Sequence, residues 1–142
     1  MNISMKKKRK NGRRSRSGAA VVEFAVVAPL MIMLTLGMME LGRVTMVKQL
    51  FINASREGAR LAVLPASTAE QVLAQVQTEL ANSGVNGAQI VLTPSSLASA
   101  SSGTPVTVTI SVAASSVSWI PKPLFVLTQT IQASTTMRRE YL

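Results

Sequence analysis

The feature that most constrains this chain is an apolar run near its N-terminus. The 21 residues from Ala19 to Met39 contain one charged side chain, that of Glu23. A helix needs about 20 mostly apolar residues to cross the hydrocarbon core of a bilayer. The Leu, Ile, Val and Phe residues of the run favour insertion by roughly 3–5 kcal/mol, which outweighs the cost of one glutamate near its end. The run therefore predicts a transmembrane helix over residues 19–41.

The positive charge of the chain is concentrated ahead of this run. Residues 1–18 hold eight of the 15 lysines and arginines and no acidic residue, whereas Arg43 and Lys48 are the bases that closely follow the run. By the positive-inside rule we expect residues 1–18 to form a basic cytoplasmic leader and the C-terminal part to lie outside the cytoplasm. A cleaved secretory signal is the alternative, because Thr35-Leu36-Gly37 offers a small-x-small site that would leave a chain starting near Met38.

The composition excludes most enzyme chemistry. The 142 residues include no His, no Cys and no Asp. Without them there is no Ser-His-Asp triad, no cysteine nucleophile and no conventional zinc site. No phosphate-binding loop or dinucleotide fingerprint is present. We expect a non-enzyme with no cofactor and no metal. The basic leader lacks the interleaved aromatic residues of a single-strand-binding surface, so we expect no nucleic-acid partner.

The segment that follows the apolar run is predicted to be helical. Apolar residues between Leu50 and Ala62 recur every 3.6 residues, which predicts an amphipathic helical extension over 42–64 that Pro65 ends. A second helix is expected to begin at Ser67, whose side chain would form a capping box with Glu70. The sequence Asn82-Ser83-Gly84 should end it.

The remaining segments alternate with a period of two, which is typical of strands. They are Ala88–Thr93, Val106–Val112 and Leu127–Met137, separated by a Ser-rich loop over 95–103 and a loop over 118–123. We expect a small antiparallel sheet packed on helix. The predicted fold class is α+β, with residues 65–142 forming an extracytoplasmic part.

The order of residues at the start of the apolar run carries a resemblance to a known family. Gly18 to Phe24 (GAAVVEF) resembles the processing site of type IV prepilins and pseudopilins. The blocks 22–30, 37–43 and 54–60 are similar in order and spacing to the TadE-like family, the pseudopilins of the tight-adherence (Flp) pilus system.

The resemblance implies a function and a set of partners. A prepilin peptidase would cut between Gly18 and Ala19, and Glu23 with Phe24 would serve recognition and subunit register. The 124 residues left after cleavage favour a minor pseudopilin over the short major pilin, and Phe24 stands where major pilins often have Tyr. The implied partners are the prepilin peptidase, other pilins and pseudopilins, the inner-membrane assembly platform and the lipid bilayer.

The implied location is the bacterial inner (cytoplasmic) membrane, with the chain acting in pilus assembly or a related secretion system. The resemblance also implies a pilin-like fold with a long N-terminal helix. The alternative is an unprocessed single-span envelope protein whose β-rich part binds a ligand or partner.

Two further groups of charged residues are candidate contact sites. Glu40 and Arg43, three residues apart, fit either an ordinary interfacial ion pair or an inter-subunit contact. Arg56, Glu57 and Arg60 fit either a solvated helix face or packing against the rest of the protein or a partner.

Overall fold

The computed structural model describes residues 14–118 and 129–139. Along this part of the chain the elements are α1 (Arg14–Ala62), α2 (Ala69–Asn82), β1 (Gln89–Thr93), β2 (Pro105–Ala113), α3 (Ala114–Val117) and β3 (Thr130–Arg138). The chain divides into two compact units, Met1–Leu36 and Gly37–Leu142, and α1 contributes to both. We call the second unit the globular unit.

Helix α1 is longer than the apolar run that predicts it. It has 49 residues and begins at Arg14, ahead of the predicted start. Arginine is a good helix former, and once a helix is nucleated each added residue gains one hydrogen bond. Pro29 lies inside the helix without ending it, as membrane helices allow. The helix ends at Ala62. Pro65 disfavours the α conformation at Leu64, the residue before it, and helices usually end at or ahead of such a residue.

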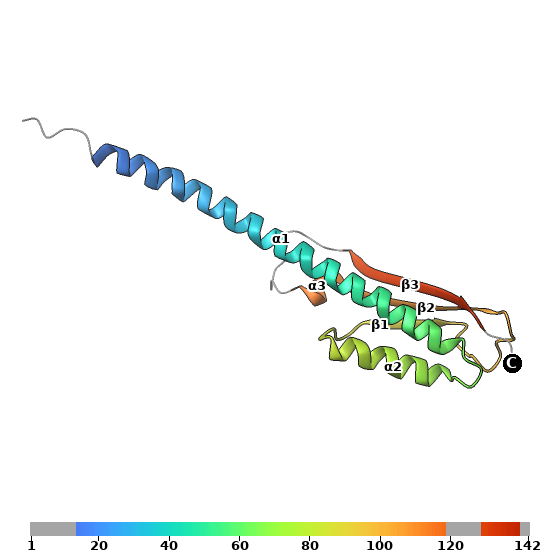
Figure 1. The fold of residues 1–142 in the computed structure, drawn as a ribbon. Coiled ribbons are helices and arrows are strands. Elements are labelled where there is room, and N and C mark those ends of the chain that lie inside the picture. The colour runs from blue at the N-terminus through green and yellow to red at the C-terminus, as the bar shows by residue number, and fades with distance from the viewer. Residues whose placement is uncertain (1–13, 119–128, 140–142) are drawn as a thin grey trace, which may run out of the picture. The chain divides into compact units, whose positions relative to one another are not determined.

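In the globular unit, α1 and α2 lie side by side over one face of the sheet (Figure 1). The two helices are close together at Gly58, where an added Cβ would lie 2.6 Å from Val76 Cγ2 of α2 and 3.5 Å from Val108 Cγ1 of β2. Phe51, Val76 and Val108 are fully buried there. The apolar face of α1 therefore packs into a core that both helices and the sheet share.

The sheet is an antiparallel meander in the order β1-β2-β3. Val108 in the central strand lies opposite Leu92 of β1 and Thr135 of β3. Along β2 every second residue from Val106 to Val112 is buried, which confirms the predicted alternation. The other face carries paired hydroxyls, with Thr107 Oγ1 2.8 Å from Thr136 Oγ1.

The start of α2 differs from its prediction by one residue. The N-cap is Thr68, whose hydroxyl accepts a hydrogen bond from the Gln71 backbone N–H, while the Gln71 side chain accepts from the Thr68 N–H. The predicted box of Ser67 with Glu70 is therefore wrong. Ser67 donates to the carbonyl oxygen of Leu64 and so belongs to the preceding turn. The two boxes compete because both put a hydroxyl three residues before a Glu or Gln.

The end of α2 is as predicted. Gly84 has φ +74° and donates to Ala81, while Val85 donates to Leu80. This pair of hydrogen bonds is a Schellman motif, in which a glycine takes up the left-handed residue after the helix.

The predicted α+β class is confirmed: a long N-terminal apolar helix, a short second helix and a small antiparallel sheet. The four-residue helix α3 was not predicted. Residues 119–123 of the predicted loop and residues 127–128 of the predicted third strand lie outside the described residues.

Candidate functional site

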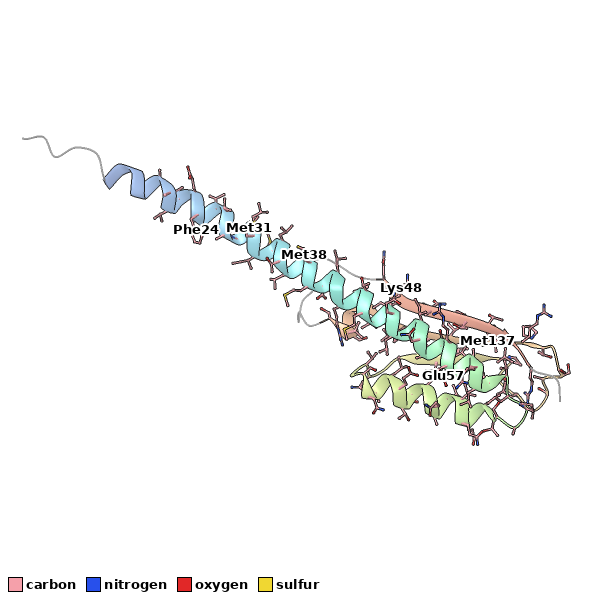
Figure 2. All side chains as sticks on the ribbon, viewed as in Figure 1. Phe24, Met31, Met38, Lys48, Glu57 and Met137 are labelled. Atoms are coloured by element: carbon pink, nitrogen blue, oxygen red, sulfur yellow. The ribbon has the colours of Figure 1, made fainter. Side chains whose placement is uncertain are left out.

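The predicted processing site lies on exposed surface of α1. Gly18 and Ala19 are exposed, and a Cβ added at Gly18 would meet no atom within 4 Å. Glu23 and Phe24 follow about one turn later and are also exposed, Phe24 by 72 %. Figure 2 shows the side chains around Phe24 and Met31 projecting from the helix. Their roles in cleavage and register stay predictions.

The surface of α1 that follows this site, over residues 24–39, is apolar and mostly exposed. In the part of the chain that the structure describes, one helix is long and apolar enough to cross a membrane, and its most apolar stretch is not buried. Hydroxyls within it are satisfied locally, since Thr35 Oγ1 donates to the Met31 carbonyl at 2.9 Å. This helix fits a single-pass membrane anchor.

Glu40 is a buried glutamate near the start of the globular unit. It is 4 % exposed, and Ser118 Oγ donates a hydrogen bond to Glu40 Oε1. Arg43, three residues on, donates from Nε to the carbonyl oxygen of Val117 at 3.3 Å. We call Glu40, Arg43, Val117 and Ser118 the Glu40 cluster. It attaches α1 to the end of α3, and sequence spacing alone did not indicate this because the partners are 74 to 78 residues apart.

Arg60 and Glu57 form an exposed ion pair on the outer side of α1. Arg60 Nη2 lies 2.8 Å from Glu57 Oε1, and Arg60 Nε lies 3.1 Å from Oε2. The hydrogen bond from Arg60 lowers the pKa of Glu57, and the same bond raises the pKa of Arg60. Arg56 is exposed as well. Exposed pairs of this kind add little to stability, and a contact between subunits through them stays a prediction.

Arg139 is a further contact residue, which sequence analysis did not single out. Its guanidinium donates to the carbonyl oxygens of Leu97 and, at 3.1 Å, Pro65. Beside it is an open depression of about 540 Å³. Its lining includes Ser67, Thr68, Glu70, Ser95, Ser96 and Leu97. The sequence did not indicate these contacts, because an arginine that follows another arginine after a strand has no pattern that points to distant carbonyl partners.

Over residues 14–118 and 129–139, no group of three or more His, Cys, Asp or Glu side chains could hold a metal ion. The exposed apolar helix joined to a small α+β unit fits the class of single-pass membrane-anchored proteins.

The comparison with protein families makes this class more specific. A family model described as TadE-like protein matches residues 18–60, all of them in α1. The match confirms the resemblance seen in the sequence, so the chain carries a TadE-like domain. The TadE-like family is a structural, pilus-associated family, and the domain therefore indicates a membrane protein of the Tad (Flp) pilus system. Searches of curated proteins and of solved structures gave no match.

Proposed function

We propose that this protein is a substrate of a prepilin peptidase and acts, once cut between Gly18 and Ala19, as a minor pseudopilin in assembly of a Tad-type pilus or a related secretion system. The observation that carries the proposal is the position of the exposed Gly18 on α1. It follows the basic leader, precedes the apolar run, and is the first residue that the TadE-like model matches.

Cleavage at this point has a clear physical consequence. It removes all eight basic residues of the leader at once and leaves the new α-amino group of Ala19 four residues from Glu23. When subunits pack helix against helix, that amine can pair with Glu23 of a neighbouring subunit. In surroundings of low dielectric constant an unpaired charge is costly, so the pair specifies the register between subunits.

The first test is the intact mass of the membrane-extracted protein, expressed with and without a cognate prepilin peptidase. We expect a loss of residues 1–18 when the peptidase is present. Gly18→Leu should abolish this loss, because it puts a bulky side chain directly before the bond that we propose is cut. Gly42→Leu is the matched control, since Gly42 is also an exposed helical glycine with no atom within 4 Å of an added Cβ.

The other outcomes of this measurement would overturn the proposal in distinct ways. An unchanged mass in both samples would indicate a plain single-span anchor with a partner-binding α+β unit. A mass that corresponds to a start near Met38 would indicate a protein released by signal peptidase.

The role of Glu23 is tested separately in assembly. Glu23→Ala should be processed and yet fail to co-purify with its partner pseudopilins, because the amine of the neighbouring subunit loses its counter-charge. Glu70→Ala, which removes an exposed glutamate from α2, is the matched control and should assemble normally. Normal assembly of Glu23→Ala would contradict the register role.

A further inference from the structure

The exposed apolar surface of α1 does not end where the sequence-predicted membrane helix ends. In the globular unit Met38, Met39, Leu41 and Met46 are 66, 51, 64 and 61 % exposed. Lys48, two residues past Met46, is the first exposed charged side chain of α1 in this unit. We call residues 38–46 the apolar belt. Past Lys48 the exposed side chains of α1 are polar, including Gln49, Asn53, Arg56 and Glu57.

Both charged residues inside the belt are hydrogen-bonded to the end of α3, where Glu40 is buried and Arg43 is half-buried. Glu40 is buried and accepts a hydrogen bond from Ser118, and Arg43 donates to the Val117 carbonyl oxygen. Arg43 Nη1 also lies 3.9 Å from the sulfur of Met46. Membrane proteins pair ionisable groups at membrane depth with other protein atoms. Among the described residues, the Glu40 cluster pairs its ionisable groups in this way.

The belt also lengthens the apolar part of α1 that follows the charged Glu23. The 18 residues from Phe24 to Leu41 measure about 27 Å along the helix axis, which is less than a hydrocarbon core of about 30 Å. Extension to Met46 gives about 35 Å, which spans the core at a tilt of about 30°, within the range observed for membrane helices.

We propose that the apolar belt is immersed in the bilayer, so that the membrane boundary lies between Met46 and Lys48 and the α3 end of the globular unit sits in the headgroup region. The partner is the lipid itself. Three observations favour lipid: α1 runs through the belt without a break, the exposed side chains of the belt carry no charge, and its two ionisable residues are hydrogen-bonded to residues 117 and 118.

Because the chain has no cysteine, single cysteines can map this boundary in the full-length protein. Leu41→Cys and Met46→Cys probe the belt, and Asn53→Cys and Arg56→Cys are matched exposed controls further along the same helix. Each variant is reconstituted at high dilution in vesicles of phosphatidylethanolamine and phosphatidylglycerol. Its reaction with a charged maleimide is followed and normalised to the rate after denaturation in SDS.

The thiolate is the form that reacts, and apolar surroundings suppress it, so we expect the belt cysteines to react about tenfold or more slowly than the controls. Equal rates at Met46→Cys and Asn53→Cys would overturn the proposal. Protection that disappears when the protein is diluted further with lipid would assign the belt to a second copy of the chain and would also overturn it. The result is independent of processing at Gly18, which the mass measurement decides.

Discussion

At the scale of single residues, Gly58 is the position where side-chain size matters most. A Cβ there would lie 2.6 Å from Val76 Cγ2, and Val76 is a β-branched residue of α2 with little rotamer freedom in a helix. We predict that Gly58→Ala is less stable than Gly42→Ala by about 1–3 kcal/mol, the usual cost of overpacking a core. Both variants gain the same helix propensity, so it cancels in the comparison.

The measurement is thermal unfolding in detergent followed by far-UV circular dichroism. The same substitution in a Val76→Ala background should cost much less, because the methyl group that the new Cβ meets is gone. If Gly58→Ala cost as much in that background as it does with Val76 present, the close contact between α1 and α2 would not be its cause. Gly42 serves as the reference because an added Cβ there meets nothing within 4 Å.

At the scale of elements, the start of α2 gives a test between two capping boxes. We predict that Thr68→Ala lowers the free energy of unfolding by about 1 kcal/mol, the typical value for loss of an N-cap side chain. Ser67→Ala should cost clearly less, because Ser67 bonds to the Leu64 carbonyl and caps no helix N–H. Equilibrium urea unfolding of the two variants measures the difference. The reverse ranking would restore the box of Ser67 with Glu70.

At this scale the sequence predicted an element correctly where a single hydrophobic period extends over the whole segment. The alternation from Val106 to Val112 predicted β2, and the 3.6-residue period ending at Ala62 predicted the packed face of α1. It failed where the decision was local, as between Ser67 and Thr68, since each has a hydroxyl and a Glu or Gln three residues on. It also missed α3, because four residues are too few to show a period.

The candidate site residues also fall into those that the sequence could indicate and those that it could not. Gly18 and Glu23 could be singled out because a glycine and a glutamate are conspicuous beside an apolar run. The surroundings of Glu40 could not be predicted, because they depend on Ser118, which only the folded chain brings near it. A charged side chain in an apolar segment signals that a partner is needed, but its sequence position does not say which residue supplies that partner.

At the scale of the whole molecule, Arg139 connects segments that are far apart in the sequence. Its side chain donates to the carbonyl oxygens of Pro65, between α1 and α2, and Leu97, between β1 and β2. Its backbone N–H and carbonyl also bond to Thr104 and Gly103 of the same β1–β2 connection, so three segments of the globular unit meet at one residue. Hydrogen bonds to a charged group contribute about 1.5–3 kcal/mol each to stability.

We therefore predict that Arg139→Ala lowers the free energy of unfolding by about 2–4 kcal/mol, because two backbone carbonyls lose a charged donor. Arg138→Ala is a closely matched control, since it removes the same charge from an exposed neighbour at the end of β3. Arg139→Lys should recover only part of the loss, because an ammonium group cannot reproduce the planar fork that reaches both carbonyls. Urea unfolding in detergent measures all three variants. Equal losses for Arg138→Ala and Arg139→Ala would mean that charge alone, and not the connection made by Arg139, stabilises this end of the globular unit.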